Sequence, residues 1–250
     1  MRQKIISIAN HKGGVGKTTT TASLGSVLAQ KGYKVLLVDL DAQANLTNSL
    51  LRSEVTDSIY NALTRKTPLP CYNINVNLDI VPASLELAQV DLELASRIAR
   101  ERILANLLEE YKQNYDFILL DCPPSLGLMT LNAITASDYV IIPLTAEVLP
   151  FTGLKMISNF IMELKKYLNP KVEILGILIT RWESTNLSKT IENGLRNISD
   201  KVFKTKIRKN VTIAQAPLEK ANIVEYDSKS NGAIDYMSFT DEFIENIKNR

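Results

Sequence analysis

Apolar residues along the chain fall into short continuous runs that alternate with longer segments of helical periodicity. The runs cover residues 5–9, 34–39, 78–81, 117–121, 139–144 and 173–180. Runs of this length with few polar residues are typical of strands buried on both faces of a sheet. Helical patterns cover residues 17–31, 97–113, 151–168, 186–198 and 238–248. This alternation predicts an α/β fold with a doubly wound, mainly parallel sheet and helices on both of its faces.

The stretches between these segments give no sign of a domain boundary. The least regular of them, residues 65–77, is interpreted as a loop within one domain, and the chain has no internal repeat or Gly/Ser-rich linker. A chain of 250 residues is long enough to bury a sizeable core. We therefore expect a single domain over residues 1–250. Right-handed crossovers should bring the carboxyl ends of its parallel strands to one edge, where ligands bind.

Charge and cysteine content exclude several classes of protein. The net charge of +2 does not indicate a class of binding partner, so local clusters of charged residues have to be considered. Cys71 and Cys122 offer neither a disulfide framework nor the spacing of a zinc site, and Cys122 is expected to be a small buried residue. The N-terminus lacks the features of a signal peptide, and no apolar run approaches the length of a membrane span. These observations favour a cytoplasmic protein.

The sequence NHKGGVGKTTTT, residues 10–21, lies between the first predicted strand and the first predicted helix. It matches the phosphate-binding pattern G-x-x-x-x-G-K-[ST] of P-loop NTPases, except that His11 stands where the first glycine is usual. The loop residues expected to bind a nucleotide are Gly13, Gly14, Val15, Gly16, Lys17, Thr18 and Thr19. The glycines let backbone N–H groups converge on phosphate oxygens, and Lys17 would reach the β- and γ-phosphates. The Thr18 hydroxyl would bind Mg²⁺, so ATP and Mg²⁺ are the expected cofactors.

Three carboxylates follow predicted strands and should therefore face the ligand edge of the sheet. Asp39 and Asp41 come at the end of the run KVLLV, and one of the two can orient the attacking water. Asp121 ends the run FILLD, which is the position of a carboxylate that holds Mg²⁺ through water. This set favours a site that hydrolyses a nucleoside triphosphate.

A basic segment, KVFKTKIRKN at residues 201–210, contains no acidic residue. If the segment is extended, Lys204, Lys206 and Arg208 share one face, and Phe203 and Ile207 lie on the other. Lysines on an edge strand commonly serve only to prevent aggregation. A site for the phosphate backbone of a nucleic acid is the alternative. The pattern alone leaves both interpretations open.

Together these motifs resemble the ParA/MinD family of deviant Walker A ATPases, and in particular its ParA/Soj partition proteins. The resemblance rests on KGGVGKTTT with its early lysine, on VLLVDLDAQANLT (35–47), on residues 115–143 and on KVFKTKIRKNVTIAQAP (201–217). It implies a Mg²⁺-dependent ATPase that hydrolyses ATP slowly and forms a homodimer with ATP. It also implies non-specific binding of double-stranded DNA to partition or position a chromosome or plasmid, a ParB/Spo0J-like stimulating partner, no membrane binding and a place on the nucleoid.

The resemblance assigns roles to individual residues as well. Lys12, the early lysine, would cross the dimer interface and contact the ATP of the partner. The expected catalytic residues are thus Lys12, Lys17 and Asp41. The expected metal site consists of Thr18, Asp39 and Asp121. Contacts to the nucleotide beyond the loop are expected from Thr180, Arg181, Ile207, Arg208, Lys209 and Asn210. The expected DNA contacts are Lys189, Lys204 and Lys206.

Two other classes within this wider family are disfavoured by the sequence. A MinD-like positioning ATPase uses its C-terminal helix on a membrane surface, for which the last segment, SFTDEFIENIKNR, is too acidic. The spacing of Phe239, Phe243 and Ile247 in that segment predicts a stripe that faces the core. A reductase like the nitrogenase iron protein needs cysteines that bridge a cluster, and neither cysteine here has a suitable neighbourhood.

Overall fold

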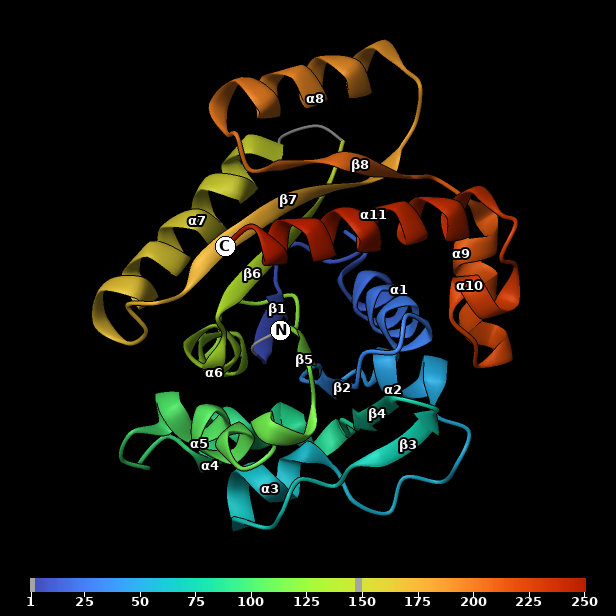
Figure 1. Ribbon diagram of the computed structural model, residues 1–250. Coiled ribbons are helices and arrows are strands. Elements are labelled where there is room, and N and C mark those ends of the chain that lie inside the picture. The colour runs from blue at the N-terminus through green and yellow to red at the C-terminus, as the bar shows by residue number, and fades with distance from the viewer. Residues whose placement is uncertain (1–2, 147–149) are drawn as a thin grey trace.

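The computed structural model describes residues 3–146 and 150–250, and its strands form one sheet (Figure 1). The strands in these ranges are β1 (Lys4–Ile8), β2 (Val35–Asp39), β3 (Tyr72–Asn75), β4 (Leu78–Val81), β5 (Phe117–Asp121), β6 (Tyr139–Thr145), β7 (Glu173–Trp182) and β8 (Val202–Arg208). They lie in the order β3-β4-β2-β5-β1-β6-β7-β8. Neighbouring strands are parallel, except that β3 and β4 are antiparallel. The predicted doubly wound, mainly parallel sheet is therefore confirmed.

Helices cover both faces of this sheet (Figure 1). They are α1 (Lys17–Gln30), α2 (Asn45–Leu50), α3 (Ile59–Arg65), α4 (Val90–Glu93), α5 (Ile103–Glu109), α6 (Leu128–Ala136), α7 (Pro150–Tyr167), α8 (Asn186–Ile198), α9 (Val211–Gln215), α10 (Ile223–Tyr226) and α11 (Asn231–Lys248). Buried apolar side chains form one cluster with the helices α3 to α8 and another with α1, α2, α10 and α11. Each cluster thus fills the space between one face of the sheet and its helices.

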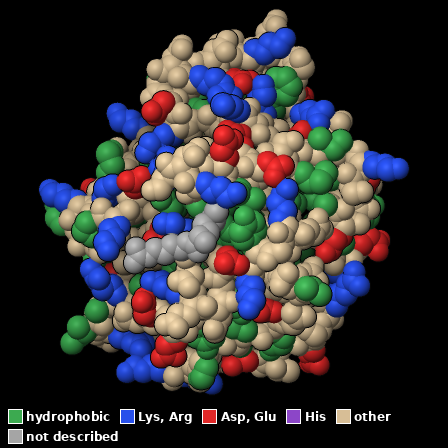
Figure 2. All heavy atoms as spheres, in the orientation of Figure 1, with side chains coloured by type: hydrophobic (Ala, Val, Ile, Leu, Met, Phe, Trp, Pro, Cys, Tyr) green, Lys and Arg blue, Asp and Glu red, His purple; other side chains and the backbone are tan. Residues whose placement is uncertain are grey.

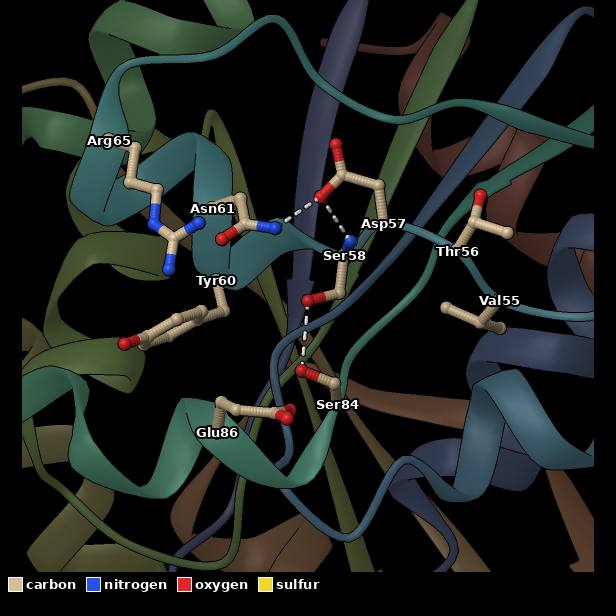
Figure 3. Close-up of a pocket in the computed structure, with 9 residues that line it drawn as sticks. All are labelled: Val55, Thr56, Asp57, Ser58, Tyr60, Asn61, Arg65, Ser84 and Glu86. Atoms are coloured by element: carbon tan, nitrogen blue, oxygen red, sulfur yellow. Dashed lines mark hydrogen bonds between the residues drawn. The ribbon is translucent and has the colours of Figure 1, made fainter.

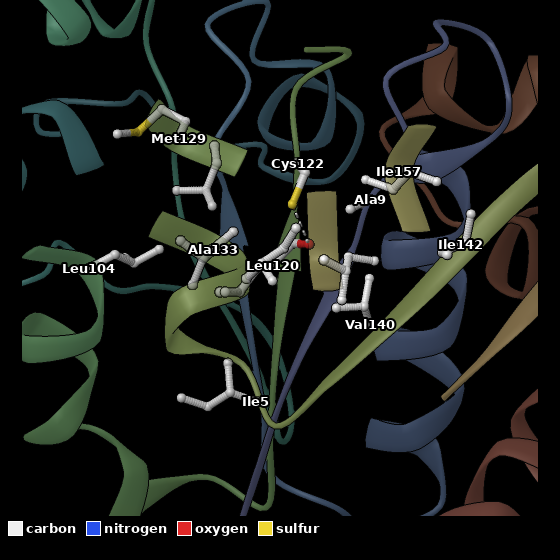
Figure 4. Close-up of a cluster of buried hydrophobic side chains, with 14 of the residues drawn as sticks. Ile5, Ala9, Leu104, Leu120, Cys122, Met129, Ala133, Val140, Ile142 and Ile157 are labelled. Carbon is white, nitrogen blue, oxygen red and sulfur yellow. Dashed lines mark hydrogen bonds between the residues drawn. The ribbon is translucent and has the colours of Figure 1, made fainter. Parts of the chain in front are cut away.

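The central strands supply side chains to both clusters, which explains why their sequences are continuously apolar. In β2, Leu36 and Val38 belong to one cluster, whereas Val35 and Leu37 belong to the other. Figure 4 shows part of the first cluster, where side chains of β1, β5 and β6 meet those of α6 and α7. Cys122 lies in this cluster and is 1% exposed, which confirms that it is a small buried residue.

The predicted helix at residues 97–113 is interrupted in the structure. Only its middle is α-helical, as α5, and the short 3-10 helices η2 (Arg100–Arg102) and η3 (Lys112–Asn114) lie on either side of it. Ala99 has a φ of 56°, which is in the left-handed region that a right-handed helix does not use. The helical prediction is therefore wrong at both ends of this segment.

The segment at residues 65–77, predicted as a loop, contains the strand β3. This strand lies at the edge of the sheet, and its sequence YNIN is only half-buried. Because an edge strand can leave one side to solvent, its composition does not mark it as a strand. Sequence periodicity also misses α2, α3 and α6, since each is too short to show more than two or three helical turns.

The last helix, α11, belongs to the core. Phe239, Phe243 and Ile247 are 0%, 0% and 4% exposed, which confirms the predicted stripe. The ring of Phe243 lies 5.5 Å from the ring of Phe117 on β5, measured between centroids. Within residues 3–146 and 150–250, no helix combines the length and the hydrophobicity that crossing a membrane requires.

Replacing Phe243 by Ala should lower the free energy of unfolding by about 3–5 kcal/mol, because it leaves a cavity between α11 and the sheet. The matched control is Ile234→Ala on the same helix, where the side chain is 43% exposed. Its effect should stay within about 0.5 kcal/mol, as for most surface substitutions. Urea unfolding followed by circular dichroism measures both. Equal losses in the two variants would contradict the place of α11 in the core.

Candidate functional site

The candidate residues gather where the carboxyl ends of β1, β2 and β5 meet. β5 lies between the other two strands, so that Asp121 is opposite Ile8 on one side and opposite Asp39 on the other. The phosphate loop follows β1 and leads directly into α1. The topology therefore brings the loop and the two strand-end carboxylates to one place, as predicted from the strand ends.

Two glycines in the left-handed region shape the phosphate loop. The φ angle is 72° at Gly14 and 84° at Gly16, values that residues with a Cβ rarely adopt. Gly16 directly precedes α1, whose first N–H groups and dipole make this end of the helix favourable for an anion. From β7, two strands away from β1 in the sheet, the Thr180 hydroxyl donates a hydrogen bond of 2.8 Å to the carbonyl oxygen of Val15. This hydrogen bond thus fixes the phosphate loop to the sheet.

Lys17 is the buried cation of the site. It is 7% exposed, and its ammonium group donates a hydrogen bond of 3.1 Å to the carbonyl oxygen of Lys12. Burial lowers the pKa of Lys17, and the nearby negative charge of Asp121 opposes this shift. An ammonium group carries three donors, so Lys17 has the capacity to meet oxygens of an anionic ligand as well.

Asp39 and Asp121 are buried carboxylates on adjacent strands, and each is 0% exposed. Asp39 accepts hydrogen bonds from the backbone N–H and from the hydroxyl of Thr47, at 2.9 and 2.7 Å. Burial raises the pKa of Asp39 to about 6, although the bonds from Thr47 oppose the shift. Burial, followed by the charge of Asp39, raises the pKa of Asp121 well above its usual value. The pair would accordingly be stabilised by a cation.

One carboxylate oxygen of Asp121 is available to coordinate such a cation. Its Oδ1 accepts a hydrogen bond of 3.4 Å from the Thr21 hydroxyl, whereas Oδ2 is buried and has no hydrogen-bond partner in the described part of the chain. The nearby Thr18 side chain opposes the rise in the pKa of Asp121, because its hydroxyl favours the charged carboxylate. These are the oxygen donors that Mg²⁺ prefers. Because no three His, Cys, Asp or Glu side chains form a metal cage within the described ranges, a metal here would complete its shell with water or ligand oxygens.

Lys12 combines a fixed backbone with an exposed side chain. Its N–H donates to Oδ1 of Asn10 at 3.1 Å, and its carbonyl oxygen accepts from Lys17. Asn10 is in turn anchored by a hydrogen bond of 2.7 Å from its Nδ2 to the carbonyl oxygen of Pro143. Lys12 itself is exposed, whereas Lys17 is buried. The two lysines of the loop thus lie in different surroundings.

Two further residues that the sequence singled out, Asp41 from a strand end and His11 from the loop pattern, lie near the phosphate loop. Asp41, two residues beyond Asp39, is half-buried, and its Oδ1 accepts a hydrogen bond of 3.0 Å from the N–H of Gln43. His11 packs against the first turn of α7, since a Cβ placed on Gly153 would lie 3.0 Å from His11 Cε1. His11, which replaces the usual first glycine, therefore contacts α7.

The nucleotide contacts predicted outside the loop lie at two neighbouring strand ends. Thr180 and Arg181 are in β7, whereas Ile207, Arg208, Lys209 and Asn210 end or follow β8. The Arg208 guanidinium forms a bidentate pair with Asp235 of α11, with Nη2 2.7 Å from Oδ1 and Nε 2.9 Å from Oδ2. Asn210 accepts a hydrogen bond of 2.8 Å from the N–H of Thr212 and so begins α9. These two side chains hold the segment in place.

Sequence reasoning missed several residues that surround this site. Asp235 and Thr47 each anchor a predicted site residue, and only Thr47 falls inside a segment that the motifs marked. A hollow beside the first turns of α1 is lined by Thr18 and Thr19 on one side and by residues including Ile213, Pro217 and Asn222 on the other. These segments are far apart in the chain, so no local pattern connects them.

The basic segment forms β8, an edge strand as the extended interpretation required. Lys204 is exposed on β8, and Lys189 is exposed on α8. Lys206 is instead engaged within the protein, because its Nζ lies 2.8 Å from a carboxylate oxygen of Glu192 and 4.2 Å from the ring centroid of Trp182. Figure 2 shows Lys and Arg side chains interspersed with acidic ones over one face. The predicted basic face is thus only partly available to a ligand.

A second polar hollow lies away from the phosphate loop (Figure 3). It is lined by Val55, Thr56, Asp57, Ser58, Tyr60, Asn61, Arg65, Ser84 and Glu86. Several of its polar groups are bonded to one another: Asp57 accepts from Asn61 at 2.6 Å, and the hydroxyls of Ser58 and Ser84 are 2.9 Å apart. None of these lining residues is a predicted site residue, and the phosphate loop does not line this hollow.

Comparisons with known proteins find relatives whose sequences align with almost the whole chain. A family model described as an AAA domain matches residues 3–174. The sporulation initiation inhibitor protein Soj of Bacillus subtilis is 42% identical over 254 residues, which cover 97% of this chain and 99% of Soj. The chromosome partitioning protein ParA of Caulobacter vibrioides is 35% identical over 256 residues, which cover 99% of this chain and 96% of ParA.

Solved structures share the fold. A protein from Mycobacterium smegmatis described as cobyrinic acid a,c-diamide synthase, with bound ADP and magnesium, has a TM-score of 0.87 and 32% identity, and covers 98% of this chain and 96% of its own. The same protein has been solved with a bound ATP analogue and magnesium. The full-length similarity to Soj and ParA, together with the loop that carries an early lysine, shows that this chain belongs to the ParA/MinD family of deviant Walker A ATPases, as a relative of the ParA/Soj partition proteins.

Proposed function

We propose that this protein is an ATP-dependent dimerisation switch that hydrolyses ATP slowly and binds double-stranded DNA without sequence preference, in order to partition or position a chromosome or plasmid. The observation that carries the proposal is the pair of lysines in one loop, with Lys17 buried beside carboxylates and Lys12 exposed on a fixed backbone. The similarity to the Soj and ParA proteins supports the role in partition.

The loop residues fit ATP and Mg²⁺. Backbone N–H groups of the loop and of the first turn of α1 would hold the phosphates, and Lys17 would meet the β- and γ-phosphate oxygens. The Thr18 hydroxyl and the unpartnered Oδ2 of Asp121 would hold Mg²⁺, with Asp39 adding negative charge beside them. The ion would neutralise charge on the β- and γ-phosphates during phosphoryl transfer. Bound nucleotide and magnesium in a related structure support this assignment.

Asp41 is proposed as the residue that orients the attacking water. It lies at the same strand end as Asp39 but is half-buried rather than fully buried, so that a water molecule can reach it. A carboxylate there can accept a proton or a hydrogen bond from that water. Because Lys17, Thr18 and Asp121 would carry binding, loss of Asp41 should affect chemistry and leave binding in place.

Lys12 is proposed to act on the nucleotide of a partner subunit. A cation placed on the charge that develops at the γ-phosphate works as an arginine finger does, which contributes roughly 10³–10⁵ in rate. If the partner supplies this cation, each site is complete only in the dimer. Hydrolysis therefore depends on dimerisation, and slow hydrolysis gives the ATP-bound dimer a long lifetime in which to hold DNA.

The DNA contacts are proposed to lie on α8 and β8. Lys189 and Lys204 are exposed there, whereas Lys206 would have to leave Glu192 in order to contribute. Contacts to the base are proposed for Thr180 and Arg181 and for residues 207–210. A ParB/Spo0J-like partner would stimulate hydrolysis, and the protein would act in the cytoplasm, on the nucleoid. The buried stripe of α11 gives no support to a membrane-binding role for that helix.

Lys17→Ala should weaken binding of Mg²⁺-ATP at least tenfold, since it removes a charge-assisted contact worth about 1.5–3 kcal/mol. Titration calorimetry measures the affinity. The matched variant is Lys12→Ala in the same loop, which should leave ATP binding by the monomer unchanged because Lys12 is proposed to act on the nucleotide of the partner subunit. Unaltered affinity in Lys17→Ala would remove the phosphate-loop assignment.

A mixture of Lys12→Ala and Asp41→Ala chains should recover part of the ATPase activity that each variant lacks alone. In a mixed dimer, one composite site contains the lysine of the Asp41→Ala chain and the aspartate of the Lys12→Ala chain. Phosphate release measured over a range of mixing ratios should peak when the two are equal. If Lys12→Ala alone dimerises and hydrolyses ATP normally, Lys12 is only a surface charge.

Reversing Lys189 and Lys204 to Glu should weaken DNA binding and make its salt dependence shallower. Each lost phosphate contact should reduce the slope of log affinity against log salt by about one. Fluorescence anisotropy with a DNA duplex at several salt concentrations measures both quantities in the presence of ATP. The control reverses Lys66 and Lys171, which are exposed on other parts of the fold. Matching losses in the two double variants would indicate a general charge effect rather than a site.

A further inference from the structure

One acidic side chain lies among the basic ones of α8 and β8. The helix α8 runs along β8, the edge strand, as Figure 1 shows. Within these two elements the charged residues are Lys189, Glu192, Arg196, Lys204, Lys206 and Arg208, so Glu192 is their only acid. One of its carboxylate oxygens lies 2.8 Å from Nζ of Lys206, which is one of the predicted DNA contacts. The single acid of this region is thus paired with a lysine that DNA would need.

Lys206 is held from a second side by an aromatic ring. Its Nζ lies 4.2 Å from the centroid of the Trp182 ring, on the neighbouring strand β7. A cation at this distance is attracted to the electrons of the ring. With the ring and the carboxylate against it, the Lys206 side chain is 28% exposed, whereas Lys204 on the same strand is exposed. Lys206 is therefore the less available of the two lysines.

Arg196 fixes the position of the carboxylate. Its Nε and Nη2 donate hydrogen bonds of 3.1 and 3.0 Å to Glu192, which lies one helical turn earlier on α8. The same guanidinium donates to the carbonyl oxygens of Val202 and Phe203 on β8, at 3.3 and 3.0 Å. The Glu192 side chain is only 13% exposed. The acid is therefore a fixed part of the contact between α8 and β8.

The surroundings of Glu192 keep it ionised. Burial raises its pKa, but the hydrogen bonds from Lys206 and Arg196 outweigh burial and lower the pKa below its usual value. An ionised carboxylate and a phosphate are both oxygen anions that bind an ammonium group through charge-assisted hydrogen bonds. A DNA phosphate can therefore bind Lys206 fully only if it takes the place of Glu192.

We propose that Glu192 restrains DNA binding by this protein, because it holds Lys206 as an internal counterion in the place that a DNA phosphate would take. The inference rests on the proposed function, in which α8 and β8 contact the DNA backbone. Binding at Lys206 exchanges one anion for another, so it adds less to the affinity than a contact at the exposed Lys189 or Lys204. The protein accordingly binds DNA more weakly than the lysines of this surface alone would allow.

Glu192→Gln should tighten DNA binding about two- to fivefold, which is the range that loss of one ion pair near the surface gives. The slope of log affinity against log salt should also become steeper by about one, since Lys206 gains a phosphate contact. Fluorescence anisotropy with a labelled DNA duplex of mixed sequence, in the presence of Mg²⁺ and ATP, measures both quantities. Glutamine keeps an oxygen that can accept from Arg196, so the contact between α8 and β8 should remain.

The matched control is Glu173→Gln at the opposite end of β7. This substitution removes the same charge and also separates an ion pair, since Glu173 lies 2.9 Å from Nη1 of Arg250. It should leave the DNA affinity and the salt dependence unchanged, because the pair is not on α8 or β8. ATP affinity, measured by calorimetry, should be the same in both variants and in the parent chain.

A second substitution tests whether the gain depends on Lys206. Lys206→Gln alone should weaken DNA binding only slightly, because Glu192 already occupies that lysine. In chains that carry Lys206→Gln, adding Glu192→Gln should no longer tighten binding, since two side chains in one ion pair are not independent. An equal gain with and without Lys206 would show that Glu192 acts only through its general charge, and would overturn the restraint.

The outcomes separate this inference from the proposed function. If neither the parent chain nor Glu192→Gln binds the duplex with ATP, the DNA-binding role fails, and the restraint with it. If the parent binds DNA and Glu192→Gln binds it no more tightly than Glu173→Gln does, the restraint alone fails. In that case the pair of Glu192 and Lys206 only stabilises the contact between α8 and β8. Tighter binding that requires Lys206 supports both proposals.

Discussion

The structure depends on charges that are buried together at the carboxyl edge of the sheet. Lys17, Asp39 and Asp121 lie within the protein, and burial lowers the pKa of the lysine and raises those of both carboxyl groups. Buried charges are tolerated only where partners compensate them. Here Thr47 satisfies Asp39, whereas one oxygen of Asp121 has no partner in the described residues. A cation bound to the phosphates of a ligand would therefore compensate the negative charge that is left at this edge.

The second half of the chain supports this edge from the side. The Thr180 hydroxyl on β7 bonds the loop at Val15, and Asp235 on α11 fixes the end of β8 through Arg208. The next residue of α11, Tyr236, has its hydroxyl 3.2 Å from that of Thr20 on α1. One long helix therefore contacts both the helix that follows the phosphate loop and the strand end that is proposed to contact the base.

The same edge carries Lys12, whose side chain a single chain leaves exposed. In the proposed dimer Lys12 would contact the nucleotide of the partner, so that association would complete the catalytic site. Such an arrangement couples nucleotide state to dimerisation, because the bound nucleotide supplies the charge that Lys12 needs across the interface.

The sequence by itself determined the central parallel sheet, the phosphate loop and the strand-end carboxylates Asp39 and Asp121, because each depends on a local pattern of apolar runs, glycines and charges. It did not reveal the edge strand β3, whose half-exposed residues carry no such pattern. Only the tertiary structure decided that Thr47 satisfies Asp39, that Asp235 anchors the end of β8 and that Lys206 is already paired with Glu192. These contacts join segments far apart in the chain, and hydrogen bonds between distant segments leave no periodic signal in an amino-acid sequence.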